Sequence, residues 1–234
     1  MSFSSDINKE LVRRLNAIEF KKNKMIYTRE LKEEVVATLV HISRYYNNRK
    51  TNVGYYYLSL DIGVSFMAVN KLYQNLTGSK TLFYDSIVHK NLGYLMPIKQ
   101  YKEWEFVEGE NMTPVFDDMF ECIHNYAYPY YNHMSDLNIV FDTMKSGEGI
   151  VHIARDRYLP ILYYLRGDKQ SGLKVIDEAI ERQLHPKQPE IPHIEGASVE
   201  LYVGPSFGRV DPAYLTFVEN YRNLPEPNQN NSLT

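Results

Sequence analysis

The first apolar residues of the chain recur at helical spacing. They are three or four positions apart, at Ile7, Leu11, Leu15 and Ile18. This spacing places them on one face of an α-helix. Residues 4–6 (Ser-Ser-Asp) are of types that cap helix N-termini. The pattern therefore predicts an amphipathic first helix with the charged pairs KE and RR on its solvent side.

Three strand-like segments follow, at 24–31, 35–46 and 54–64. The second would also suit a helix, but its β-branched residues and the turn-forming NNRKTN that follows favour a strand. The third alternates, with one set of positions at Tyr55, Tyr57, Ser59 and Asp61 and the other at Tyr56, Leu58, Leu60 and Ile62. We expect an antiparallel meander with one face buried by the first helix.

A helix and two short strands are predicted after Gly63. A helical stripe is formed by Phe66, Val69, Tyr73 and Leu76, with Gly78 as its stop. Two short segments, 93–98 (GYLMPI) and 103–108 (EWEFVE), are expected to extend the sheet.

From Thr113 onward the pattern is helical. Thr113 is predicted as a cap with Pro114 at the first helical position, where a missing N–H is harmless; the shared face is Val115, Met119, Cys122 and Tyr126. Ser135 is expected to cap a helix that runs through Met144, with inward residues Leu137, Val140, Phe141 and Met144.

Residues 151–184 are predicted to form two antiparallel helices that turn at Gly167-Asp168, the first of them kinked at Pro160. This segment resembles one hairpin of a tetratricopeptide-type repeat, and a single copy predicts no solenoid.

The C-terminal part is expected to be an extension. Residues 185–197 are rich in proline and predict an extended connector, 198–203 (SVELYV) a short strand, and Asp211-Pro212 the start of a last helix through Tyr221. The fold class is therefore α+β. We expect one domain over 1–184, with a sheet part to about 110 and a helical part over 111–184. An extension over 185–222 and a disordered tail over 223–234 would follow.

Composition indicates an ordinary soluble protein. The 234 residues are 44% hydrophobic and 24% charged, with a net charge of −3. No global positive field attracts nucleic acid or anionic lipid. A single cysteine, Cys122, forms no internal disulfide, and the charged N-terminus lacks the apolar run of a signal peptide. No membrane span is expected, and the predicted location is the cytoplasm. The 20 tyrosines against 10 phenylalanines fit a compositional bias of the source.

The sequence contains no complete catalytic or metal-binding motif. The segment GPSFG (204–208) matches G-x-S-x-G, but the next helix cap comes at Asp211, and all seven histidines precede Ser206. A glycine-rich turn explains it better than a hydrolase. Cys122 and His124 would point in different directions on a helix, and there is no H-E-x-x-H, paired C-x-x-C, P-loop or G-x-G-x-x-G. We expect no cofactor, no metal and no catalytic residue.

Nucleic-acid binding is a weaker alternative. GYYYLSL (54–60) could display stacking tyrosines beside NNRK, but such sites also need a positively charged groove. The net charge opposes that, and tyrosines on a sheet ordinarily pack.

The order of several short motifs resembles an uncharacterised bacterial family, the domain of unknown function 4304 family. The motifs are EFKKNKMIYTREL, YYYLSLDIGV, YLMP with EW, IHNYAYPYY and YYLRGDKQSGLKVIDEAI, within residues 10 to 183. The resemblance implies an α+β fold. It implies no activity, and it does not reach the part after 185.

The segment ECIHNYAYPYYNHMSDL (121–137) holds the candidate binding residues Tyr126, Tyr128, Tyr130, Tyr131 and His133. Pro129 is expected to end the preceding helix. Tyr126, Tyr130 and Tyr131 would then pack over the sheet with their rings buried. Alternatively, an exposed tyrosine surface would anchor a partner.

Function is expected to be non-enzymatic recognition of another protein, as in an immunity or adaptor-like protein. The alternative is an enzyme or small-ligand protein with a nonstandard pocket in which His124, His133 or Asp156 converge. A third possibility is a homo-oligomer formed through the C-terminal extension, with SVELYV pairing edge to edge.

Overall fold

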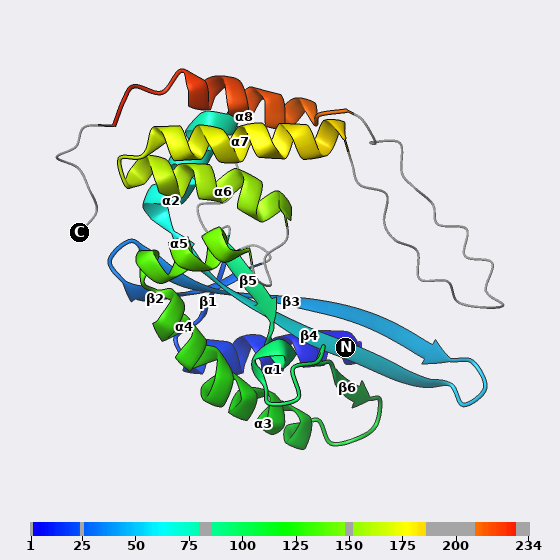
Figure 1. The fold of residues 1–234 in the computed structure, drawn as a ribbon. Coiled ribbons are helices and arrows are strands. Elements are labelled where there is room, and N and C mark those ends of the chain that lie inside the picture. The colour runs from blue at the N-terminus through cyan, green and yellow to red at the C-terminus, as the bar shows by residue number, and fades with distance from the viewer. Residues whose placement is uncertain (1, 24–25, 80–85, 148–151, 186–208, 228–234) are drawn as a thin grey trace. The chain divides into compact units, whose positions relative to one another are not determined.

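The computed structural model describes residues 2–23, 26–79, 86–147, 152–185 and 209–227 (Figure 1). Backbone contacts divide the chain into two compact units. Unit 1 lies within 1–71 and 81–150, and unit 2 within 72–80 and 151–234. The boundary at 150 falls inside the helical part that we assigned to 111–184. The predicted α+β class is confirmed, because an antiparallel sheet and separate helices make up the fold.

Unit 1 is built on an antiparallel sheet. Its strands are β1 (Lys21–Asn23), β2 (Ile26–Lys32), β3 (Val35–Asn48), β4 (Val53–Phe66), β5 (Val88–Asn91) and β6 (Trp104–Val107). The order is β1-β2-β3-β4-β5, and β6 also pairs with β4. The predicted meander of the three main strands is confirmed. β3 and β4 pair over their whole length, from Val35 opposite Phe66 to Asn48 opposite Val53.

One face of the sheet is packed against helices α1 (Phe3–Ala17), α3 (Thr113–Cys122) and α4 (Tyr128–Met134) (Figure 1). The Tyr56 hydroxyl donates to Asn8 Oδ1 of α1 over 3.4 Å, and the rings of Phe106 and Phe116 lie 4.9 Å apart. Leu58, Leu60 and other apolar residues of this face are fully buried. Burial of this alternating set is the main stabilising contribution to unit 1.

The predicted strand over 93–98 is wrong. Leu92–Leu95 form a 3-10 helix, and the strand that adds to β4 is β5, just before it. The Asn91 side-chain oxygen accepts hydrogen bonds from the backbone N–H groups of Gly93 and Lys102, each over 3.0 Å. Such side-chain bonds offer the backbone an alternative to ladder pairing, so the chain turns here.

Three predicted helix caps are shifted. α1 begins at Phe3, before the Ser-Ser-Asp run, and Thr113 lies inside α3, whose N-cap is Met112. The cap of α5 (Leu137–Ser146) is Asp136 rather than Ser135, and its carboxylate accepts from the N–H of Asn138 over 2.8 Å. Serine and aspartate are both good caps. The sequence therefore did not determine which of these two adjacent residues caps α5.

The prediction that Pro129 ends its helix is also wrong. Ile123–Ala127 form a π-helical turn, η2, that joins α3 directly to α4. The N–H of Tyr128 donates to the carbonyl of Ile123, five residues earlier. A wider turn of this kind shifts the hydrogen-bond register, and Pro129 then lies in the first turn of α4, where its missing N–H costs little.

Unit 2 consists of helices. It contains the second half of α2 (Met67–Thr77), together with α6 (His152–Leu165), α7 (Lys169–Leu184) and α8 (Pro212–Arg222). The predicted hairpin of α6 and α7 is confirmed, with Gly167 at φ 84° and the Asp168 carboxylate capping the N–H of Ser171 over 2.9 Å. The ring of Tyr73 lies 5.2 Å from that of Tyr158 and 6.3 Å from that of Phe217. Tilted aromatic pairs thus contribute to this core.

The predicted strand over 198–203 and the GPSFG segment lie outside the described residues. The same holds for most of the connector and of the tail. None of the described helices combines the length and the hydropathy that crossing a bilayer requires.

Candidate functional site

The five residues predicted as a binding surface are distributed between core and surface of unit 1. Tyr131 is buried, and its hydroxyl donates to the backbone carbonyl of Thr38 in β3 over 3.0 Å. Tyr126, Tyr128 and Tyr130 are half-buried, and His133 is exposed. The packing interpretation therefore holds for Tyr131, whereas Tyr128 and His133 offer accessible groups.

Burial keeps the hydroxyls of Tyr130 and Tyr131 protonated. The hydroxyl of Tyr130 is enclosed and has no hydrogen-bond partner among the described residues. Burial raises the pKa of both Tyr130 and Tyr131 far above the ordinary value of a tyrosine. Proton transfer by these two groups near neutral pH is therefore unfavourable, which argues against a catalytic role for them.

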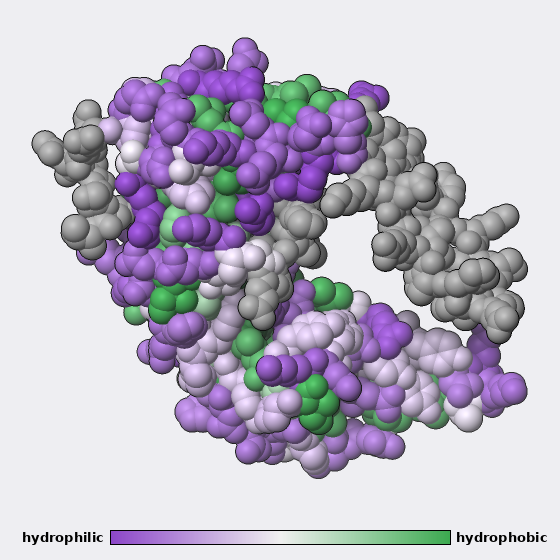
Figure 2. Space-filling model, in the orientation of Figure 1, coloured by the Kyte–Doolittle hydropathy of each residue, from purple (hydrophilic) through white to green (hydrophobic). Residues whose placement is uncertain are grey.

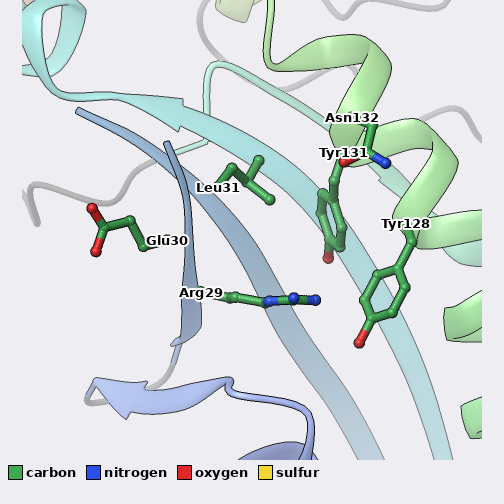
Figure 3. A pocket seen from close by; sticks show the side chains of 6 residues that line it. All are labelled: Arg29, Glu30, Leu31, Tyr128, Tyr131 and Asn132. Atoms are coloured by element: carbon green, nitrogen blue, oxygen red, sulfur yellow. The ribbon is translucent and has the colours of Figure 1, made fainter. Parts of the chain in front are cut away.

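Tyr128 and Tyr131 do line a small cavity of about 210 Å³ between β2 and α4 (Figure 3). Figure 3 shows the side chain of Arg29 extending from β2 toward Tyr128, while Glu30 points away from it. The guanidinium lies over the Tyr128 ring at 5.0 Å and also forms an ion pair with Glu19 at 3.1 Å. Glu19 therefore balances the charge of Arg29 at this cavity.

A larger cavity of about 480 Å³ lies over β4, β5 and the 3-10 helix of the same unit. Its lining consists of Asp61, His89, Lys90, Asn91, Tyr94 and Tyr101. The Tyr101 hydroxyl donates to Ser59 Oγ over 2.9 Å, and the Asn91 amide donates to Asp61 Oδ1 over 3.3 Å. These bonds hold the wall in place. Its volume falls in the range of small-molecule sites.

An accessible surface of unit 1 lies on the outer part of the β3–β4 hairpin, which we call the arm (residues 41–59). Figure 1 shows the tip of the arm extending beyond α1, while β6 pairs with β4 of the arm at Tyr55–Leu58. In Figure 2, residues of intermediate hydropathy cover this region among hydrophilic ones. Because paired residues of antiparallel strands share a face, the register places five side chains together on the face that α1, α3 and α4 leave uncovered. This arm face consists of Ile42, Arg44, Tyr46, Tyr55 and Tyr57.

The arm face is open and partly preorganised. Ile42 is 51% exposed and Tyr46 57% exposed. The Arg44 guanidinium lies 4.4 Å from the centre of the Tyr57 ring and donates to Glu103 over 2.7 Å. A hydrogen bond to Glu105 raises the pKa of Tyr57. Contacts of this kind fix the rings without covering them, which lowers the entropy cost of binding.

The groups considered for chemistry are held in structural contacts. Burial raises the pKa of the Cys122 thiol, which makes it less reactive. The carboxylate of Asp156 is buried and bound by Arg182, and His124 is exposed with its ring against Tyr128. Within the described parts of the chain, no three His, Cys, Asp or Glu side chains gather closely enough to hold a metal ion.

The arm face was not predicted from the sequence as a binding surface, although the alternation that places two of its tyrosines on one side of a strand was recognised. The alternation placed Tyr55 and Tyr57 on one side of their strand, but their accessibility depends on which face of the sheet the helices cover. The exposure of Ile42 and Tyr46 depends on how far β3 extends beyond β2. β3 has 14 residues and β2 has 7.

Comparison with known proteins gives no further indication of function, since no protein-family model, curated protein or solved structure matches this chain.

Proposed function

We propose that this chain works by non-enzymatic recognition of another protein, as an immunity or adaptor-like protein of a bacterial cytoplasm. The observation that carries the proposal is the arm face, where aromatic and apolar side chains are exposed together beside Arg44. Aromatic residues and arginine are enriched among residues that anchor protein interfaces. The resemblance to the domain of unknown function 4304 family agrees with a bacterial source and adds no activity.

The sheet explains why these residues are available for binding. Both strands of the arm are paired to each other, so its backbone order does not depend on the side chains of the arm face. Ile42 and Tyr46 contribute little to the core while they are half exposed. A partner that covers them would remove apolar area from water at about 25 cal/mol per Å² before the costs of association.

Capture from lysates of the source cell tests this proposal with a matched control. The arm variant is Ile42→Ser with Tyr46→Ser. The control is Leu184→Ser with Leu215→Ser, which removes two similarly exposed apolar side chains from unit 2. We expect the unaltered chain and the control to retain the same stoichiometric partner and the arm variant to lose it. Recovery of no stoichiometric partner by any of the three, or equal retention by all, would contradict the proposal.

A second candidate function is binding of a small polar molecule in the 480 Å³ cavity. Tyr94 and Tyr101 are each about half exposed at the cavity, with Asp61 and Asn91 in its wall. Rings with a few fixed polar groups are the usual composition of such sites. Thermal-shift titration with a panel of monosaccharides would show stabilisation that Tyr94→Ala abolishes and Leu215→Ala retains. Absence of any shift with the unaltered chain would remove this candidate.

A further inference from the structure

Along the arm, the backbone of β3 pairs on one side only within the part of the chain that the structure describes. β2 pairs with β3 only as far as Ile26 opposite Val40. Beyond that point, residues His41–Asn48 pair with β4 on one side. Among the described residues, no strand pairs with their other side. An edge of this length presents a row of backbone N–H and C=O groups that can template another strand.

Within the described parts of the chain, this edge has little of the usual protection against pairing. It contains no proline and no acidic residue, its only formal charge is that of Arg44, and no register shift interrupts its pairing with β4. Residues Ile42–Asn47 are all exposed. Native sheets usually prevent edge pairing with bulges, prolines or inward-pointing charges. An unprotected edge of eight residues is therefore able to pair with another strand.

We propose that a second copy of the chain covers this edge, by antiparallel pairing of Ile42–Asn48 with the same strand of its partner. A two-fold axis normal to the sheet keeps the faces continuous, so only residues of the same face can lie opposite each other. This condition leaves few registers. Centring on Arg44 would place its charge opposite itself, which is destabilising. Centring on Ser43 would bring Tyr46 opposite Val40, which is already paired with β2.

Centring on Tyr45 satisfies each condition. Tyr45 then lies opposite Tyr45 of the partner subunit, and Arg44 opposite Tyr46 of the partner subunit on both sides of the axis. Aromatic cross-strand pairs and cation–π contacts are both favourable. Ser43 meets Asn47 of the partner subunit and Ile42 meets Asn48 of the partner subunit, so seven consecutive residues pair without two like charges facing each other.

The dimer has a consequence for the surface described above. Because the two-fold axis is normal to the sheet, both arm faces lie on the same side of one continuous sheet. The pairing does not require the proposed partner, since it uses the backbone edge and lateral contacts of Arg44 and Tyr46, and it leaves the outward side of the arm face open. Its area is smaller than that of a standard stable interface, so we expect a reversible, concentration-dependent dimer.

Sedimentation velocity over a range of concentrations tests the pairing. The full chain is expected to convert from monomer to dimer as its concentration rises. Tyr45→Glu and Tyr45→Lys each place two like charges directly across the axis, so each should weaken dimerisation about tenfold or more, the effect of about 1.4 kcal/mol. Asn47→Glu is the matched control on the same face, because its new charge meets Ser43 of the partner subunit.

Mixing gives the sharpest readout. An equimolar mixture of the Tyr45→Glu and Tyr45→Lys chains should dimerise at least as well as the unaltered chain, because opposite charges then face each other. Circular dichroism establishes that both variants are folded. A monomer at every concentration, or a mixture that dimerises no better than its components, would overturn the pairing. Neither result would bear on capture of a partner by the arm face, so the two proposals can fail separately.

Discussion

The hydroxyl of Tyr131 donates to the backbone carbonyl of Thr38 over 3.0 Å, although the two residues are 93 positions apart in the chain. This bond ties α4 to the central strand β3 inside the core of unit 1. Its neighbour Tyr130 has an enclosed hydroxyl with no partner among the described residues. The two adjacent tyrosines therefore offer a matched pair for measuring what a buried hydroxyl contributes.

Tyr131→Phe should destabilise the protein by about 1 kcal/mol, because it removes a buried hydrogen bond. Tyr130→Phe removes a hydroxyl that burial has desolvated without compensation, so it should be neutral or stabilise by about 1 kcal/mol. Urea unfolding followed by circular dichroism gives both free energies. Equal losses for the two variants would contradict the assigned hydrogen bond.

Stability should fall with acid through His41. Burial, and then the charge of Lys22, lower the pKa of His41 below its ordinary value of 6.5. Below pH 6.5 the unfolded chain binds a proton that the folded chain does not, so the free energy of unfolding decreases until the lowered pKa is reached. His41→Gln removes this contribution. Between pH 7.5 and pH 5.5 the unaltered chain should lose more stability than the variant, and parallel pH profiles would count against a buried neutral imidazole.

The ion pair of Asp156 and Arg182 is expected to stabilise unit 2. The Asp156 side chain is 10% exposed and that of Arg182 is 38% exposed. Asp156→Asn should cost about 1 to 3 kcal/mol, less than for a pair buried on both sides. Asp177→Asn is the control, since Asp177 and Arg222 are both exposed and such pairs contribute about 1 kcal/mol or less. Thermal unfolding of the two variants would show whether the buried carboxylate matters more.

Gly172 in α7 is required by a close contact rather than by its backbone angles. A Cβ added there would lie 1.9 Å from the hydroxyl oxygen of Tyr221, which donates to the carbonyl of Pro160 over 2.9 Å. Gly172→Ala should therefore destabilise by about 1 to 3 kcal/mol, despite the gain in helix propensity. Combining it with Tyr221→Phe should recover part of the loss in a double-mutant cycle. Strictly additive losses would show that the contact is not responsible.

The sequence predicted the local elements better than the contacts that decide their ends. Alternation from Tyr55 to Ile62 and the Gly167-Asp168 turn depend on nearby residues, and both are confirmed. The turn at Asn91 and the π-helical passage at Pro129 depend on hydrogen bonds that periodicity does not reveal. The α+β class followed from the pattern alone. The helix starts at Asp168 and Asp211 were predicted correctly, whereas those of α1, α3 and α5 were displaced by one to a few residues.

The structure divides the predicted binding residues between the core and the surface. Tyr128 lines a cavity, but Tyr131 is a core residue, because a run of tyrosines in a helix divides between its faces. The arm face could not be predicted, since the exposure of Ile42 and Tyr46 depends on where β2 stops pairing with β3. The point at which β2 stops pairing with β3 is determined by tertiary structure rather than by the residues of the arm.

Covalent footprinting of tyrosines, with and without the captured partner, tests the central claim most directly. We expect the partner to protect Tyr46, Tyr55 and Tyr57 from modification, while Tyr126 and Tyr128 react equally in both states. Protection confined to Tyr126 and Tyr128, with the arm tyrosines unchanged, would show that the partner binds elsewhere and would contradict the account.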